Sequence, residues 1–128
     1  MTRVLFDSDI IIDFLRGNKG ARRVMSSIKD ADLPCCSVIT VAEIRAGMRE
    51  TEEQVTMSLL GSLDILSIDK NIAQLAGDLK RKTRQQQLEL DDCFIAATAI
   101  EHHAILITHN SKHYPHKDLQ LKKARYYC

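Results

Sequence analysis

The sequence has no excess of either charge and no long apolar run. Its 128 residues carry 18 basic and 17 acidic side chains, so any binding of nucleic acid must rest on local patches and not on overall charge. No apolar run is long enough to cross a bilayer, and Asp7 interrupts the first one, which excludes a secretory signal of the usual pattern. We therefore expect a cytoplasmic protein without a membrane anchor.

Cysteine patterns that bind metals are also missing. None of the four cysteines forms a C-x-x-C pair, and the adjacent Cys35 and Cys36 have poor spacing for zinc. A chain of this length without a signal peptide favours free thiols over disulfides. We expect Cys35, Cys36 and Cys93 to be small core residues.

Linkers, repeats and low-complexity segments are absent, and the length fits one domain over residues 1–128. Short apolar strands are predicted at residues 4–6, 35–39, 64–69 and 104–108, with a basic edge strand at 121–127. Helical patterns separate them, at residues 9–16, 19–31, 40–48, 51–63, 69–87 and 90–100. Strands that alternate with helices predict an α/β fold with a mostly parallel sheet of about four to five strands, covered on both faces.

Several polar residues follow the predicted strands or begin the helices beside them. In a parallel sheet, ligands bind beyond the carboxyl ends of the strands. The residues that this rule selects are Asp7, Glu43, Asp69, Asp91, Asp92 and Asn110. Three or four carboxylates that are far apart in the sequence are therefore expected to converge in one cleft.

Converging carboxylates repel each other, and burial strengthens the repulsion, so such a group needs a cation. Oxygen ligands without His or Cys suit Mg²⁺ or Mn²⁺, which can activate water for phosphodiester hydrolysis. Simpler roles are also open to these acids. Glu43 has the capping-box spacing from Thr40, while Asp91 and Asp92 suit the cap and first turn of a helix, as Asp9 does for an earlier one.

Other signatures of phosphate chemistry are missing. The sequence has no G-x-x-x-x-G-K loop and no complete D-x-D-x-T/V motif, although DSDII at residues 7–11 begins like one. A phosphatase or a small-molecule phosphotransferase on a similar scaffold is therefore disfavoured.

Three stretches of the chain together resemble PIN-domain ribonucleases. VLFDSDIIIDFLRG (residues 4–17) resembles the opening strand, Asp-Thr-Asn and aliphatic helix start of that family. SVITVAEIRAGM (residues 37–48) resembles its second motif, a glutamate after Thr-x-Ala. Residues 90–114 resemble its last two motifs, Asp-x-x-Ile-Ala-Ala-x-Ala and a strand that ends in Thr-x-Asn. The short length and the Ala-Glu-Ile-Arg-Ala-Gly stretch are most similar to VapC-type toxins of bacterial toxin–antitoxin pairs.

The resemblance implies a role for each matching residue. Asp7, Glu43 and Asp92 would hold the metal, and Asn110 would orient water or substrate. Asp91 would then be a cap or an accessory acid. The resemblance also implies a three-layer α/β/α sandwich and a Mg²⁺-dependent endoribonuclease in which Mn²⁺ can substitute. The implied partners are an RNA substrate, a cognate antitoxin protein and a second copy of the chain.

The sequence departs from the family pattern at three places. Ser8-Asp9 replaces the common Thr-Asn, so Asp9 could join the metal site. Residues 86–87 are glutamines where a glycine turn is common, and His113 stands where an acid often sits. None of these changes touches the three acids assigned to the metal.

Two alternatives stay open at this point. One is a PIN-domain nuclease with a housekeeping role in RNA processing. The other is a non-catalytic RNA- or protein-binding module on the same fold, against which the presence of all three acids argues. Basic clusters at residues 22–23, 80–84 and 112–123 could contact phosphates, although each alone also fits a solvated surface.

Overall fold

The structure, a computed structural model, describes residues 2–86 and 88–126. Its strands are β1 (Arg3–Phe6), β2 (Leu33–Ser37), β3 (Asp64–Leu66), β4 (Ile105–Thr108) and β5 (Gln120–Lys123). They form one sheet in the order β3-β2-β1-β4-β5, and every neighbouring pair is parallel. The predicted parallel sheet is confirmed, and the basic strand β5 lies at its edge as expected.

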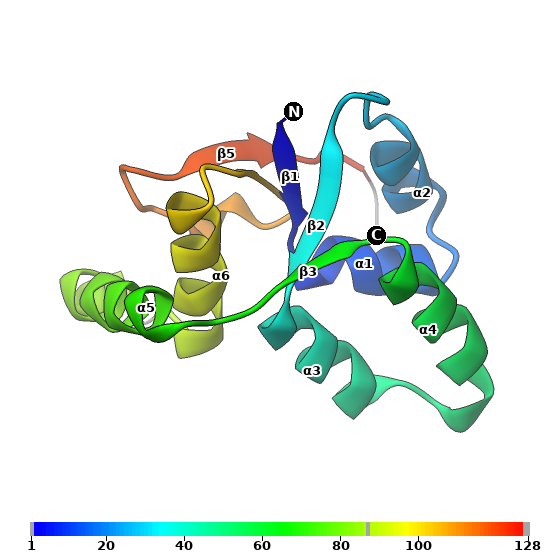
Figure 1. Cartoon of the computed structure of the whole chain (residues 1–128), viewed down its shortest axis with the longest axis horizontal. Helices are drawn as coiled ribbons and strands as arrows, with labels where there is room; N and C mark the ends of the chain where they lie inside the picture. The colour runs from blue at the N-terminus through cyan, green and yellow to red at the C-terminus, as the bar shows by residue number, and fades with distance from the viewer. Residues whose placement is uncertain (1, 87, 127–128) are drawn as a thin grey trace.

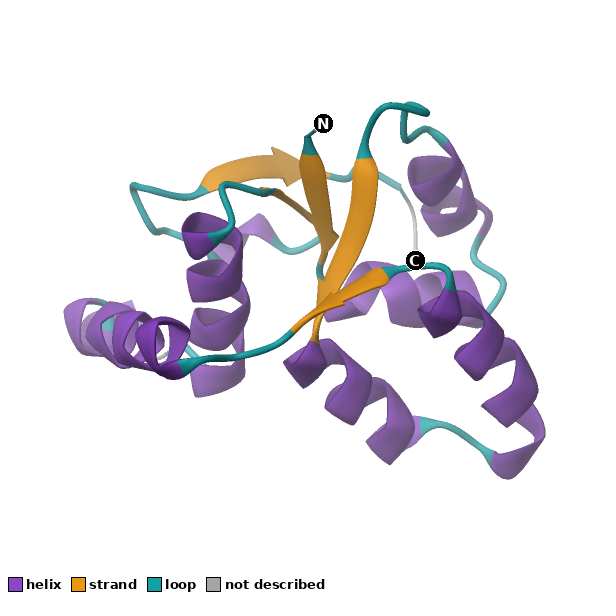
Figure 2. Ribbon diagram, viewed as in Figure 1, coloured by secondary structure: helices purple, strands orange, loops and turns teal. Residues whose placement is uncertain are grey.

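The helices cover both faces of this sheet. They are α1 (Ser8–Leu15), α2 (Lys19–Ser26), α3 (Val38–Gly47), α4 (Glu53–Gly61), α5 (Lys70–Lys82) and α6 (Leu90–Glu101). Helices α1 to α4 gather on one side, whereas α6 packs on the other side with α5 against it (Figures 1 and 2). This arrangement confirms the three-layer α/β/α sandwich.

Successive side chains of β1 face opposite layers, as the pleat of a strand requires. Val4 and Phe6 belong to the core on the side of α1, whereas Leu5 packs in the core with Ile95 of α6. All four side chains are at most 4% exposed. The strand therefore reads as a continuous apolar run because both of its faces are buried.

The cysteines behave as predicted from their spacing. Cys35, Cys36 and Cys93 are free and fully buried. Cys128 lies outside the described residues. Burial raises the pKa of the Cys36 thiol to about 12, so this side chain is an inert core residue at neutral pH.

The N-terminal caps of α1 and α3 differ from the sequence prediction. Helix α1 begins at Ser8 with Asp7 as its N-cap residue, so Asp9 is not the cap. Helix α3 begins at Val38 because Ser37 is the cap and its hydroxyl accepts from the Ile39 N–H at 3.1 Å. The predicted capping box of Thr40 and Glu43 is therefore wrong, and both side chains are available for other contacts.

The end of α5 and the length of β2 also differ. Helix α5 ends at Lys82, where the Thr83 hydroxyl bonds back to the Leu79 carbonyl at 2.8 Å, so the helix does not continue to Gln85 and Gln86. Its predicted last residue, Gln87, lies outside the described residues. Strand β2 stops at Ser37, two residues earlier than expected.

The chain order creates a switch point between β1 and β4. The chain runs outward from β1 to β2 and β3, and then returns to place β4 on the other side of β1. Loops that leave two such strands diverge, and the crevice between them is the usual ligand site of a parallel sheet. The Asp7 N–H donates to the Ile107 carbonyl at 2.9 Å, which ties the first of the candidate acids to this point.

No helix within the described residues has the length and apolar character to span a membrane.

Candidate active site

Asp7 is held at the switch point by three hydrogen-bond donors. Its side chain is buried, with 6% exposure. Oδ1 accepts from the Ser8 N–H at 2.8 Å and from the Tyr114 hydroxyl at 2.9 Å. Oδ2 accepts from the Thr108 hydroxyl at 2.7 Å, across 101 positions of sequence. The end of β4 and the turn after it therefore fix this carboxylate at the end of β1.

Glu43 reaches the same place from α3. The Ser8 hydroxyl donates to Glu43 Oε1 at 2.7 Å and lies 2.9 Å from the Thr40 hydroxyl. Thr40 is fully buried, which explains its place in the sequence better than a capping role does. Ser8 therefore links the first turn of α1 to α3 and orients the glutamate.

Asp92 approaches from the first turn of α6. The Tyr114 hydroxyl, which donates to Asp7, also lies 3.5 Å from Asp92 Oδ1. His113 Nδ1 lies 3.3 Å from Asp92 Oδ2, and the aspartate side chain is only 17% exposed. Tyr114 therefore stands between two acids from opposite sides of the crevice.

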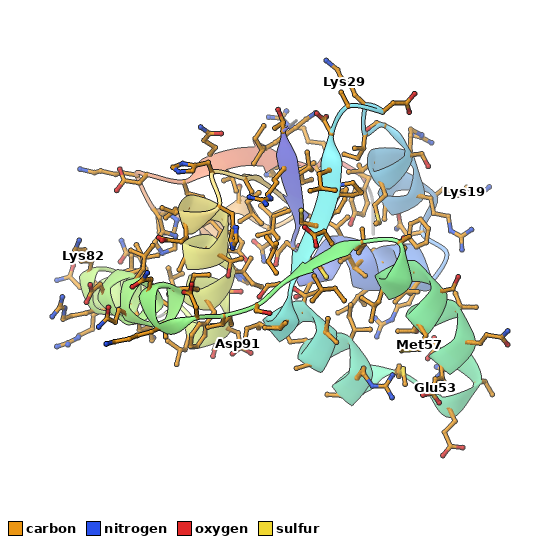
Figure 3. All side chains as sticks on the ribbon, in the orientation of Figure 1. Lys19, Lys29, Glu53, Met57, Lys82 and Asp91 are labelled. Atoms are coloured by element: carbon orange, nitrogen blue, oxygen red, sulfur yellow. The ribbon has the colours of Figure 1, made fainter. Side chains whose placement is uncertain are left out.

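The neighbouring Asp91 is not the cap of α6, so the predicted capping role is wrong. Helix α6 begins at Leu90, and its N-cap residue is Glu89, which makes no side-chain capping bond. Asp91 lies in the first turn and is exposed at the surface (Figure 3). Its negative charge suits the helix N-terminus without a cap contact.

The other two polar candidates lie outside the group of three acids. Asn110 is exposed at the rim, where its N–H donates to the Thr108 hydroxyl at 3.0 Å and its Nδ2 lies 3.1 Å from His113 Nε2. Asp69 caps α5 and accepts from the Ile72 N–H at 2.9 Å, so its position after β3 has a structural explanation.

Burial and mutual repulsion set the protonation of the three acids. Burial raises the pKa of Asp7 above its ordinary value, although its three hydrogen bonds act to lower that pKa. Burial also raises the pKa of Glu43. It raises the pKa of Asp92 to about 6, where His113 opposes the shift and the charges of Asp7 and Glu43 add to it. The three carboxylates therefore lie within electrostatic reach of one another, and a cation would relieve their repulsion.

Asp9 adds a fourth acid to this region. Burial, followed by the charge of Asp7, raises its pKa to about 7. Its Oδ1 is buried and has no hydrogen-bond partner among the described residues. A buried carboxylate oxygen without a partner is costly in a folded protein. Asp9 is therefore suited to serve as an additional oxygen ligand.

Comparison with known proteins decides the family. Residues 4–118 match the model of the PIN domain. The chain belongs to the PIN-domain family. It is 38% identical over 115 residues to Ribonuclease VapC10 of Mycobacterium tuberculosis, across 88% of this chain and 86% of that protein. It is 32% identical over 114 residues to Ribonuclease VapC19 of the same organism, across 87% of this chain and 91% of that protein.

A solved structure shows the same likeness in three dimensions. A chain in a toxin–antitoxin complex from Klebsiella pneumoniae superposes with a TM-score of 0.83 at 28% identity. The match covers 97% of this chain and 99% of that chain. The resemblance to PIN-domain proteins of the VapC type, carried by three sequence stretches, is thereby confirmed.

The donor set of this PIN-domain site fits a hard divalent cation. Asp7, Glu43, Asp92 and the partnerless oxygen of Asp9 offer carboxylate oxygens, which Mg²⁺ and Mn²⁺ prefer. As the side chains stand, no three His, Cys, Asp or Glu residues within 2–86 and 88–126 are arranged to hold a metal ion. Mg²⁺ does not require such a cage, because it usually binds one or two carboxylates together with waters and substrate phosphates.

We expect Asp9→Asn to stabilise the metal-free protein at pH 8 by about 1–2 kcal/mol, after a discount for partial solvent screening. The pKa of Asp9 rises from 3.8 to about 7 in the folded state. A raised carboxyl pKa means that the folded state keeps its full stability below about pH 4 and loses some as pH rises through 7.

Urea unfolding of both proteins in EDTA tests this expectation. The difference should be present at pH 8 and close to zero at pH 4. An equal difference at both pH values would show that the substitution acts through packing and not through the charge of Asp9.

Sequence reasoning missed the residues that connect the acids in this PIN-domain site. Tyr114 carries no motif of its own, Thr108 was noted only as the end of a strand in the Thr-x-Asn motif, and Thr40 looked like a helix cap. A buried tyrosine hydroxyl in a short turn after a strand has no sequence period that would mark it. Only the folded chain shows that Tyr114 lies between Asp7 and Asp92.

Proposed function

We propose that this chain is a metal-dependent endoribonuclease that uses Mg²⁺, with Mn²⁺ as a substitute, and is the toxin of a toxin–antitoxin pair. The observation that carries the proposal is the meeting of Asp7, Glu43 and Asp92 at the switch point of the sheet. They come from three distant segments, and Ser8 and Tyr114 join them into one network. The ribonuclease relatives and the toxin–antitoxin neighbour support the choice of RNA and of an antitoxin partner.

The acids and the residues around them would divide the work of hydrolysis. Asp7, Glu43 and Asp92 would hold the divalent ion, which would supply an activated water and neutralise charge on the departing oxygen. Ser8 holds the Glu43 carboxylate in place, and Tyr114 holds Asp7. Asn110 and His113 lie together at the rim, where they would orient water or a phosphate oxygen of the substrate.

The partners follow from the same proposal. An antitoxin protein would restrain the activity, and a second copy of this chain would complete a homodimer. The cytoplasmic location stays a prediction, and it agrees with an RNA substrate.

Product analysis tests the proposed reaction. The purified chain is incubated with a panel of structured and unstructured RNAs in Mg²⁺, in Mn²⁺ and in EDTA. We expect cleavage in either metal and none in EDTA, with no 2′,3′-cyclic phosphate ends, because water and not the ribose hydroxyl attacks phosphorus. Cleavage in EDTA, or cyclic phosphate products, would contradict the proposal.

A further inference from the structure

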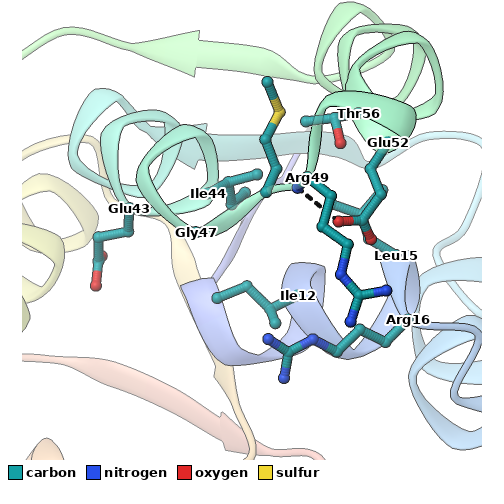
Figure 4. Close-up of a pocket in the computed structure, with 10 residues that line it drawn as sticks. Ile12, Leu15, Arg16, Glu43, Ile44, Gly47, Arg49, Glu52 and Thr56 are labelled. Carbon is teal, nitrogen blue, oxygen red and sulfur yellow. Dashed lines mark hydrogen bonds between the residues drawn. The ribbon is translucent and has the colours of Figure 1, made fainter.

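A cavity of about 530 Å³ lies beside the acidic site, bounded by α1, α3, the turn at Glu50–Glu52 and α4 (Figure 4). Glu43 lies at one side of it, and therefore belongs both to the cavity and to the acid cluster. Ile12 and Ile44 contribute apolar surface between Glu43 and the far side. A chain molecule bound at the acids would extend into this space.

Two arginines from different elements lie at the side of the cavity opposite Glu43. Arg16 follows α1 and Arg49 precedes the Glu50–Glu52 turn, yet their guanidinium groups extend toward the same space (Figure 4). Within the described part of the chain, neither forms an ion pair with a carboxylate. The nearby Glu52 carboxylate instead accepts a hydrogen bond from the Arg49 backbone N–H at 2.7 Å. Two cations that converge without a partner favour an anionic ligand.

A third polar group of the cavity also lacks a partner. The Thr56 side chain lines the cavity and is 1% exposed, and its hydroxyl makes no hydrogen bond to any described residue. Buried hydroxyls are nearly always paired, so a partnerless one next to a cavity points to a bound molecule. The cavity therefore offers two cations, a hydroxyl and apolar surface, and its volume is that of a small-molecule site.

We propose that this cavity binds the nucleotide next to the scissile phosphodiester, with Arg16 and Arg49 on its phosphate. Ile12 and Ile44 contact its sugar or base, and the Thr56 hydroxyl bonds to it. The inference rests on the proposed ribonuclease function. RNA is favoured over an acidic protein segment because an RNA strand cut at the acids must continue past Glu43, which also lines this cavity.

Binding measurements in an uncleaving background test the inference. Asp7→Asn serves as the parent, and a fluorescent single-stranded RNA is titrated in Mg²⁺ at several salt concentrations. Arg16→Gln/Arg49→Gln should weaken binding at least tenfold and lower the slope of log K against log salt by about 1.4, since each phosphate contact on a single strand contributes about 0.7. The matched control is Lys19→Gln/Lys29→Gln, which removes two exposed charges from α2 and the turn after it (Figure 3). It should bind like the parent.

A second variant reports on the hydroxyl without changing charge. Thr56→Val should raise the melting temperature, because it removes a buried group without a partner, and should still weaken RNA binding several-fold. A purely structural role would move stability and affinity in the same direction.

The other possible outcomes would overturn the inference, each for a different reason. If the parent binds RNA and the arginine variant binds equally, or if the lysine control loses as much, the cavity is not the subsite. If the variant loses only a poly-glutamate peptide titrated in parallel, the cavity receives an acidic protein segment. If the parent itself does not bind RNA, the proposed function fails together with the inference.

Discussion

Asp7→Asn is expected to lower the rate of RNA cleavage by about a thousand-fold or more. Under the proposed function, the charge that Asp7 would give to the metal would contribute several kcal/mol to transition-state stabilisation, and about 4 kcal/mol corresponds to a thousand-fold in rate. Asparagine keeps the shape of the side chain and is as good an N-cap as aspartate, so α1 should still form. The loss should therefore appear in single-turnover cleavage of RNA while the circular dichroism spectrum is unchanged.

The variant Asp91→Asn is a matched control for this prediction. Asp91 is exposed and one position from Asp92, so Asp91→Asn removes the same charge from the same region without removing a proposed ligand. We expect this variant to cleave within a few-fold of the wild type. Wild-type activity in Asp7→Asn, with contaminating nuclease excluded, would refute the assignment of Asp7.

Mg²⁺ is expected to raise the melting temperature of the wild-type chain by roughly 10 °C at a concentration of a hundred times its Kd. A ligand at that concentration stabilises the folded state by about 2.7 kcal/mol, and a domain of this size gains roughly 4 °C for each kcal/mol. The triple variant Asp7→Asn/Glu43→Gln/Asp92→Asn should lose this shift. Its own melting temperature in EDTA should be higher than that of the wild type, because the repulsion among the acids is gone.

Differential scanning calorimetry in EDTA and in Mg²⁺ measures both effects. A control variant with the same loss of charge is Asp30→Asn/Glu50→Gln/Asp118→Asn, whose three side chains are exposed. It should keep the full shift. An equal shift in the variant of the three site acids would place the metal elsewhere in the molecule.

The position of the acids was predictable because it depends on a general property of parallel sheets. Asp7 directly follows an apolar strand, and Asp92 begins an apolar helix, so both were expected at the carboxyl edge. Asp69 satisfied the same rule but caps α5, which shows that the rule selects an edge and does not by itself select a site. The resemblance to the family supplied the choice among the acids.

The contacts within the site were not predictable, since they join segments that have no local relation. Thr40 and Glu43 had the spacing of a capping box, but Ser37 took the capping role and left both side chains to meet Ser8. Likewise, no feature of the sequence distinguishes Arg16 and Arg49 from ordinary surface arginines. Only the packing of α1 against α3 brings them to one cavity.

The central claim is that Asp7, Glu43 and Asp92 hold the divalent ion on which RNA cleavage depends. The most direct test is a Mn²⁺ titration in which bound ion, measured by electron paramagnetic resonance, and the rate of RNA cleavage are followed in the same samples. We predict that both rise with the same midpoint in the wild type and that Asp92→Asn loses both. Cleavage before any Mn²⁺ binds, or unchanged Mn²⁺ binding in Asp92→Asn, would contradict the claim.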